Sequence, residues 1–143
     1  TVPFKITLAT KDLTDITLNG DKGTITNMGA IEILKLTLTN TGGGKMDLRV
    51  KTDELVLNTE NAGAIKVEGT ANMVKISSKS TGDIDAKELS TFYTEVESNG
   101  SGNIYTNTVN GIDGNLNSTG NLYYRVTKTV NVSENAEGKV IKQ

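Results

Sequence analysis

The chain has 143 residues and a formal net charge of −2, with 35% hydrophobic and only 4% aromatic residues. A balance so close to neutral does not attract nucleic acid or an anionic membrane. No stretch approaches the roughly 18 apolar residues of a membrane-spanning helix. Cysteine and histidine are both absent, which excludes disulfides and Cys-bound metals and removes the commonest general base. The length suits one domain, which we assign to residues 1–143.

Seven glycines recur along the chain at intervals of 21, 19, 19, 20, 18 and 18 residues, and an aliphatic residue follows each at the second position. They are Gly23, Gly44, Gly63, Gly82, Gly102, Gly120 and Gly138. A period near 20 is typical of a solenoid, in which each repeat is one turn of a continuous coil. We therefore predict about seven coils of 18–21 residues, with the repeat glycines at structural corners.

Two strands are expected in each coil, one before and one after its glycine. Aliphatic residues stand eight and six positions before Gly44, at Leu36 and Leu38, and two and four positions after it, at Met46 and Leu48. This alternation with period two predicts strands with one buried face. The same offsets recur at Leu55 and Leu57, Ile65 and Val67, Val74 and Ile76, and Ile84 and Ala86.

A polar turn that ends in the repeat glycine separates the two strands, as in Asn-Thr-Gly-Gly-Gly at 40–44. Glycine adopts a positive φ there without steric cost, which we take as the reason for its use. A second, looser corner is expected farther along each coil, with a short apolar contact around Leu89 and Val109. Phe92 and Tyr93 are predicted to fill the wide bend that follows Leu89.

These patterns favour an all-β fold, a parallel β-helix about 30 Å long whose core is a file of stacked aliphatic side chains. The alternative is an antiparallel β-sandwich, because the Asn-Gly pairs at 19–20, 99–100 and 110–111 would suit hairpins. A sandwich does not require matching residues at a period near 20, so we prefer the β-helix.

Several segments also resemble one bacterial family. They are the run 82–89, Gly-Asp-Ile-Asp-Ala-Lys-Glu-Leu, the step 100–104, Gly-Ser-Gly-Asn-Ile, and the run 118–124, Ser-Thr-Gly-Asn-Leu-Tyr-Tyr. In this order they resemble the putative auto-transporter adhesin, head GIN domain, with its repeated Gly-Ser-Gly-Asn/Asp steps and closing Gly-Asn-Leu/Val-x-Tyr coil. The sequence departs from the family pattern where Arg125-Val126-Thr127 replaces the usual Gly-x-Pro.

The resemblance implies a right-handed β-helix on exported, often lipid-anchored proteins of Bacteroidetes-like bacteria. It places the chain at the cell surface, at the outer membrane or in the periplasm, and a lipid anchor would lie outside this sequence. It carries over no catalytic residue and no cofactor. The chain begins Thr-Val-Pro-Phe without methionine, which we interpret as a mature form from which an export signal has been removed.

One outward-facing column predicts a binding surface. Tyr105, Tyr123 and Ile141 each stand three positions after a repeat glycine, so they should lie on consecutive coils opposite buried Ile104 and Leu122. Aromatic rings suit both sugar rings and protein partners. The alternatives are a cross-strand pair that only stabilises the sheet, or cover by the C-terminal tail.

Other candidate chemistry has a simpler structural explanation. The Gly-Ser-Gly-Asn step at 100–103 looks like a phosphate loop, but a strand rather than a helix follows it. Asp83 is expected to stand in a polar ladder with Asn103, without the roughly six oxygens that calcium prefers. Arg49 and Arg125 would lie four coils apart, with no converging carboxylate pair of the kind polysaccharide hydrolysis needs.

The sequence thus predicts a non-enzymatic exported β-helix module for adhesion or display, with no cofactor and no metal. Its expected partner is a glycan, a host or cell-surface protein, or a second copy of the chain, because β-helix faces and edges self-associate. The alternatives are a carbohydrate-binding module built on Tyr105 and Tyr123, and a polysaccharide-cleaving enzyme.

Overall fold

The computed structural model describes residues 13–125 and 127–143, and every regular element in them is a β-strand. The strands are β1 (Asp15–Leu18), β2 (Thr24–Thr26), β3 (Ile31–Asn40), β4 (Lys45–Asn61), β5 (Ala64–Ser80), β6 (Ile84–Ser98), β7 (Ile104–Leu116), β8 (Leu122–Arg125), β9 (Thr129–Glu134) and β10 (Val140–Lys142). All pairings between them are parallel. The predicted parallel β-helix is confirmed, and the antiparallel sandwich is wrong.

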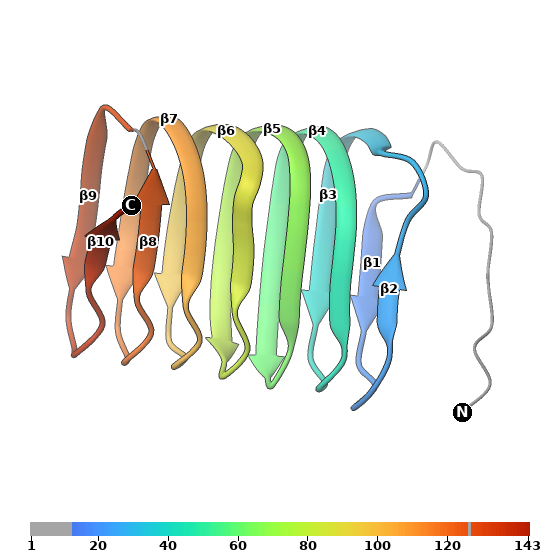
Figure 1. Ribbon diagram of the computed structural model, residues 1–143, viewed down its shortest axis with the longest axis horizontal. Helices are drawn as coiled ribbons and strands as arrows, with labels where there is room; N and C mark the ends of the chain where they lie inside the picture. The colour runs from blue at the N-terminus through green and yellow to red at the C-terminus, as the bar shows by residue number, and fades with distance from the viewer. Residues whose placement is uncertain (1–12, 126) are drawn as a thin grey trace.

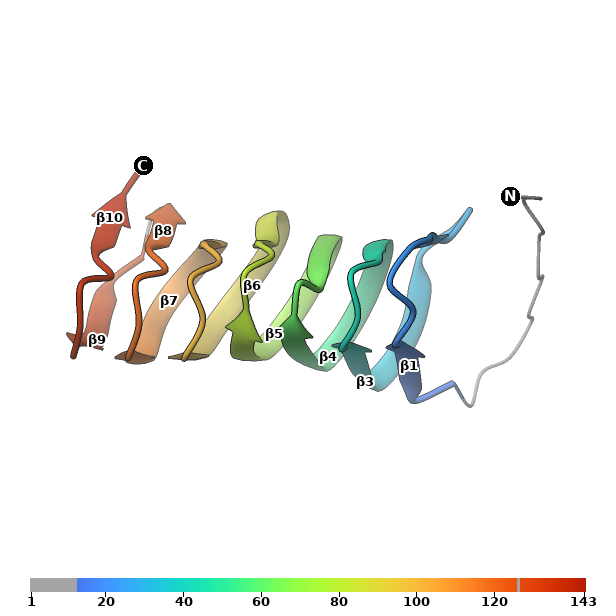
Figure 2. The ribbon, with the colours of Figure 1, turned by 90° about the horizontal axis from the view of Figure 1, so that it is seen from below.

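The chain winds as a flattened coil that advances from right to left in Figure 1. It climbs the face nearer the viewer, passes over an upper bend and descends the farther face, so the coil is right-handed (Figure 1). Strands β4 to β7 each follow this whole path without a break. The view from below shows the coils side by side along the long axis (Figure 2). We call the two sides the near face and the far face, and the upper bend the crest.

The core is a set of aliphatic columns that run along the axis. On the far face Leu36 pairs with Leu55, and Leu55 with Val74, all three fully buried. The near face contributes the column Met46, Ile65, Ile84, Ile104 and Leu122, each in register with the next. Burying one such side chain stabilises the fold by about 1.5–3 kcal/mol.

The repeat glycines form the lower edge of the coil, where most of them lie against the glycine of the preceding coil and Gly63 lies against Asn40 instead. A Cβ on Gly82 would stand 2.4 Å from the Gly63 carbonyl oxygen, and one on Gly102 would stand 2.0 Å from that of Gly82. Gly120 and Gly138 are equally close to the glycine before them. Only Gly23 of the seven has a positive φ, at 116°. The expectation that φ explains these glycines is therefore wrong for the other six, where close backbone approach is the reason.

A ladder of side-chain oxygen acceptors follows the same edge. The Oδ1 atom of Asp83 accepts a hydrogen bond from the backbone N–H of Asn103, at 2.8 Å. Asn103 does the same for Asn121 at 3.0 Å, and Asn121 for Lys139 at 2.8 Å. Each side chain thus binds the corresponding residue of the next coil. The ladder predicted for Asp83 and Asn103 is present, and it uses one carboxylate oxygen of Asp83.

The crest differs from the sequence-based prediction. Leu89 is fully buried as expected, but Val109 is 51% exposed and Phe92 is 57% exposed. The register shifts at the bend, where Val109 and Asn110 together stand opposite Phe92. Val109 follows buried Thr108 in the alternation that begins at Ile104 and so points outward, and the extra residue interrupts the alternation only after it. Tyr93 does not fill the bend either, because it lies over Gly111 on the outer surface.

Threonines occupy the interior of this bend in place of apolar side chains. The hydroxyl oxygens of Thr91, Thr94 and Thr108 lie 2.8–3.1 Å from one another and are at most 4% exposed. Within the triangle and with the Asn107 carbonyl, which accepts from Thr91 at 3.3 Å, every hydroxyl can donate one hydrogen bond, so no buried donor is left unpaired. The bend is therefore filled by a satisfied polar cluster, which the hydrophobic pattern could not indicate.

The Glu134 carboxylate links the end of β9 to the start of β10 in the last coil. Glu134 Oε1 accepts from the backbone N–H of Val140 at 2.8 Å, and Oε2 lies 3.2 Å from Lys139 Nζ. The backbone hydrogen bond from Val140, and secondarily the Lys139 ammonium, hold the pKa of Glu134 below its ordinary value of 4.5. Its contribution to stability is thus complete above that value and is lost as the pH falls through the lowered pKa.

Glu134→Gln is expected to lower the melting temperature at pH 7, because the amide keeps an acceptor but loses the negative charge. The difference from wild type should shrink below pH 4.5 and disappear once Glu134 is protonated in the folded protein. Circular dichroism melts between pH 7 and 2.5 would measure it. Glu137→Gln removes the same charge from the same turn and serves as the control. A difference that persists at the lowest pH would contradict this role.

Candidate functional site

The candidate surface lies along one column of the near face. The residues three positions after the repeat glycines are Cα partners across consecutive strands: Thr26, Asp47, Lys66, Asp85, Tyr105, Tyr123 and Ile141. They face outward because the residue preceding each one points into the core, as Ile104 and Leu122 do at 0% exposure. The structure thus places the three predicted surface residues next to one another on β7, β8 and β10.

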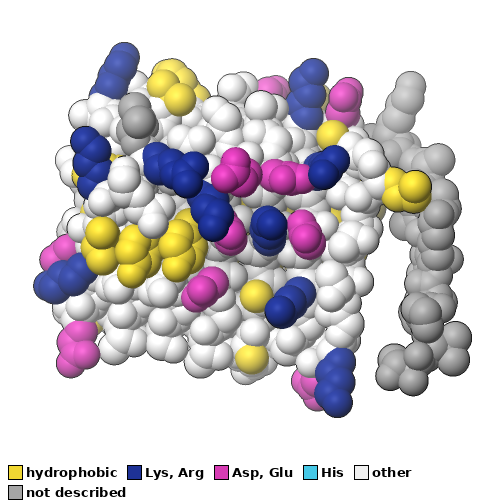
Figure 3. Space-filling model, viewed as in Figure 1, with side chains coloured by type: hydrophobic (Ala, Val, Ile, Leu, Met, Phe, Trp, Pro, Cys, Tyr) yellow, Lys and Arg dark blue, Asp and Glu magenta, His cyan; other side chains and the backbone are white. Residues whose placement is uncertain are grey.

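This column changes character along the axis. Its first half carries the alternating charges of Asp47, Lys66 and Asp85, whereas its last three positions are Tyr105, Tyr123 and Ile141. Figure 3 shows this division on the near face, with a row of hydrophobic side chains over the C-terminal coils and charged side chains beside it and farther along. The apolar row is therefore a discrete patch with a charged border.

The two tyrosine rings stack on each other. Their centroids are 4.9 Å apart and their planes differ by 10°. The ammonium group of Lys87 lies 5.7 Å from the centroid of Tyr105, in a cation–π contact, and 3.5 Å from Asp85 Oδ2. The second face of Tyr105 is thus occupied as well. Such a pair stabilises the sheet by about 0.5–1.5 kcal/mol beyond its buried area.

The stacked geometry decides which atoms the patch offers to a partner. Because the rings follow the coil axis one above the other, their edges and hydroxyl groups are outermost. The Tyr123 hydroxyl lies 3.4 Å from the side-chain amide of Asn121, a long contact in which the amide donates. A ligand would meet ring edges and phenolic oxygens, with half-buried Ile141 adjoining Tyr123 on the next coil.

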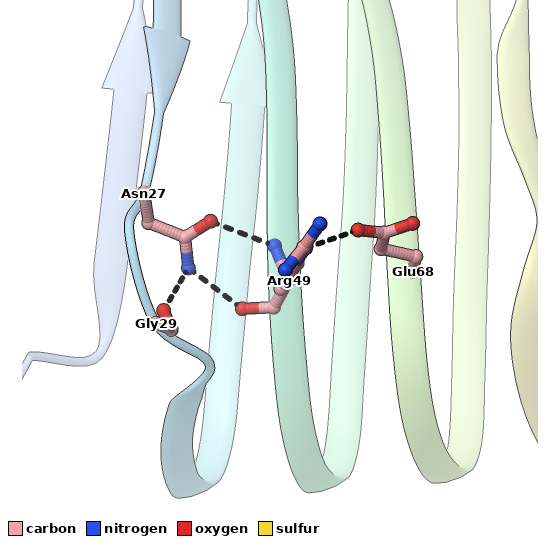
Figure 4. Close-up of polar contacts among 4 residues, drawn as sticks. All are labelled: Asn27, Gly29, Arg49 and Glu68. Atoms are coloured by element: carbon pink, nitrogen blue, oxygen red, sulfur yellow. Dashed lines mark hydrogen bonds and ion pairs between the residues drawn. The ribbon is translucent and has the colours of Figure 1, made fainter.

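At the N-terminal end of the near face, side chains form hydrogen bonds and an ion pair between neighbouring coils, drawn in Figure 4. Asn27 follows the last residue of β2, and its amide donates to the carbonyl oxygens of Gly29 and Arg49, at 2.7 and 2.8 Å. Its Oδ1 accepts from the Arg49 N–H at 2.9 Å. Asn27 thus replaces the missing strand residue opposite β4. The Arg49 side chain pairs with Glu68 on β5.

The two arginines considered for polysaccharide cleavage lie far apart in the structure. Arg49 on β4 and Arg125 on β8 belong to coils separated by β5, β6 and β7. Arg125 pairs loosely with Glu88, at 3.9 Å. Within residues 13–125 and 127–143, no three acidic, histidine or cysteine side chains are grouped so as to hold a metal ion. The same described residues contain no helix of the length and apolarity needed to cross a membrane.

Sequence reasoning missed a trough of about 700 Å³ at the crest. Its rim carries Leu34, Phe92 and Val109, three of the large hydrophobic side chains most exposed among the described residues. These residues follow their repeat glycines by 11, 10 and 7 positions, so no constant offset connects them. The signal that could have found them is the interruption of the period-two alternation at this corner of each coil.

Comparison with known proteins agrees with this architecture. A family model described as "Putative auto-transporter adhesin, head GIN domain" matches residues 1–127. The chain is similar to the crystal structure of a putative adhesin from Bacteroides fragilis, with a TM-score of 0.86 and 25% sequence identity. The match covers 92% of this chain and 61% of that one, so this chain spans about three fifths of its length. No curated protein matches the chain.

Proposed function

The chain belongs to the family of auto-transporter adhesin head GIN domains, and we propose that residues 1–143 form one non-enzymatic binding module of an exported protein. The module would act at the cell surface, at the outer membrane or in the periplasm. Its role would be adhesion or display through the outer faces of the coil. The similarity to a putative adhesin of Bacteroides fragilis supports a binding role, as does the near-face patch.

The observation that carries this proposal is the outward-facing, half-buried row of Tyr105, Tyr123 and Ile141 on three consecutive coils. The row interrupts the charged pattern that Asp47 and Lys66 set earlier in the same column. Contiguous apolar groups rimmed by charges are typical of contact sites. Tyrosine also contributes contact area at low entropic cost, because its side chain has few rotatable bonds.

The geometry favours a protein partner, or a second copy of the chain, at this patch. A sugar ring that stacks on tyrosine needs a free ring face, and the faces of Tyr105 are occupied by Tyr123 and Lys87. The carbohydrate-binding alternative at the tyrosine pair would have to displace Lys87, which is also paired with Asp85. Ring edges and hydroxyl groups instead suit hydrogen bonding to a protein surface.

The Tyr105→Ala/Tyr123→Ala variant tests the patch. We expect it to remain folded, because the pair contributes only about 0.5–1.5 kcal/mol beyond its area, and to lose at least tenfold in retention. The readouts are retention of the labelled domain on bacterial and epithelial cells, and self-association by size-exclusion chromatography with light scattering. Tyr93→Ala, on the far face, is the matched control and should behave as wild type.

Two outcomes would contradict the proposal. A folded double variant with unchanged retention and unchanged oligomeric state would remove the patch as the contact surface. Product release from acidic polysaccharides at high protein concentration would remove the non-enzymatic assignment. If only the oligomeric state changes in the double variant, the patch is an assembly surface between copies of the chain.

A further inference from the structure

The crest carries a second column of outward-facing residues, one from each of five consecutive coils. They are Leu34, Asp53, Asn72, Phe92 and Val109, and all are exposed. The strand pairing skips this position in β3 to β6, for example between the pairs Ile33–Thr52 and Lys35–Glu54. The chain bends here, so these side chains fan outward from the ridge.

The column has apolar ends and a polar middle. Leu34 is 76% exposed at one end, and Phe92 and Val109 are more than half exposed at the other. Between them the Asn72 amide donates to Asp53 Oδ1 at 2.9 Å. The adjoining floor is made of small side chains, Thr70, Ala71 and Ser90. The result is a shallow, widely open trough of about 700 Å³ that crosses several coils.

The lining chemistry fits a sugar better than other ligands. A sugar ring has an apolar C–H face, which packs on an aromatic ring, and hydroxyl groups, which pair with carboxylate and amide side chains. Among the described residues, the aromatic stacking pair is Tyr105–Tyr123, and Phe92 belongs to no such pair. A purely apolar ligand would leave Asp53 and Asn72 desolvated without adequate partners, at an unfavourable free-energy cost.

The backbone at the crest is poorly placed to bind a peptide as an added strand. Strand addition needs free carbonyl and N–H groups on the receiving chain. The Leu34 carbonyl already accepts from the Thr52 hydroxyl at 3.0 Å, and the Asn107 carbonyl accepts from Thr91 at 3.3 Å. Strand addition would have to displace these contacts, whereas the side chains of Phe92, Asn72 and Asp53 are exposed to a hydroxyl-rich ligand.

We propose that the crest trough is the carbohydrate-binding site of this module. Phe92 stacks under the C–H face of one sugar ring, and Asn72 and Asp53 bind its hydroxyl groups or those of the next ring. Leu34 lies three coils from Phe92, roughly 14 Å at about 4.8 Å per coil, which gives room for more than one ring. This inference rests on the proposed binding function and assigns its ligand class to a surface separate from the tyrosine patch.

The test is a glycan array of neutral and acidic oligosaccharides, probed with the full chain. We expect binding by wild type, with at least a tenfold loss in Phe92→Ala and in Asn72→Ala. Phe92→Tyr should retain binding, because it keeps the ring. Met28→Ala removes another exposed hydrophobic side chain, 85% exposed and outside the trough, and should bind as wild type. These surface changes should leave the melting temperature nearly unchanged.

The outcomes separate this inference from the proposed function. No binding to any glycan, or binding that Phe92→Ala leaves intact, overturns the crest site. If Tyr105→Ala/Tyr123→Ala abolishes cell retention while the wild-type chain binds no glycan on the array, the proposed function stands and the crest site fails. Loss of glycan binding in Tyr105→Ala/Tyr123→Ala but not in Phe92→Ala would mean that the sugar-binding site lies on the near face, at the tyrosine pair. Capture of a protein that Phe92→Ala prevents, with no glycan bound, overturns the sugar assignment.

Discussion

Ile104→Asp is expected to unfold the protein at room temperature. Ile104 is fully buried in the near-face core column, in register with Ile84 and Leu122. An unpaired carboxylate there costs several kcal/mol or more, and the lost burial of isoleucine adds about 1.5–3 kcal/mol. The total is comparable with the roughly 5–15 kcal/mol by which domains are stable. Loss of the β-sheet circular dichroism signal and of protease resistance would measure it.

The adjacent residue provides the matched control. Tyr105→Asp introduces the same charge one position later, where the side chain points outward, so the protein should remain folded. Its melting temperature should fall by the modest amount due to the lost ring stack and to the new carboxylate beside Asp85, its partner on β6. An Ile104→Asp protein that melts near the wild-type temperature would show that this column does not form the core.

Gly114→Ala is the second substitution with a large expected effect. Gly114 has a φ of 149°, and a Cβ there would stand 1.8 Å from the Val96 carbonyl oxygen. Strained backbone angles cost about 1–3 kcal/mol, and overpacking against rigid backbone costs about 1–3 kcal/mol more. The free energy of unfolding should therefore fall by about 2–6 kcal/mol, as measured by urea titration.

Gly29→Ala is the control for this effect. A Cβ on Gly29 has no atom within 4 Å, and its φ is not positive. Its free energy of unfolding should stay within about 0.5 kcal/mol of wild type, as is usual for surface changes. Equal urea midpoints for the two alanine variants would mean that the backbone at Gly114 relaxes, and the close-approach argument would fail.

The near face could be predicted well from the sequence because each of its residues stands at a constant number of positions after the repeat glycine. Close to the repeat glycine, each coil begins with the same turn and the same strand, so counting from glycine fixes the register. This is why Tyr105, Tyr123 and Ile141 lie together as expected. Counting could not show that the rings stack face to face, because that depends on rotamers and on the position of Lys87.

The crest could not be predicted because the differences in coil length are absorbed there. Between Asp85 and Ser90 four residues of β6 stand opposite a single residue of β7, and the imbalance reverses one step later. A shift of one residue turns a side chain from the core to the surface. Gly111 and Ile112 are both buried as a result, whereas Val109, expected from its apolar character to contact the core, is exposed. The three threonines of the buried triangle follow no constant offset from the repeat glycines, so the repeat pattern gave no sign of them.

The parallel pairing of every coil with the next has a mechanical consequence. Backbone hydrogen bonds between coils lie along the long axis, so tension applied between the first and last coils peels them apart in sequence instead of shearing many bonds at once. Each coil released would free 18–21 residues, roughly 60–70 Å of extended chain. A load carried through such a domain would lengthen it stepwise, and the domain would shorten again as each coil re-forms on the next.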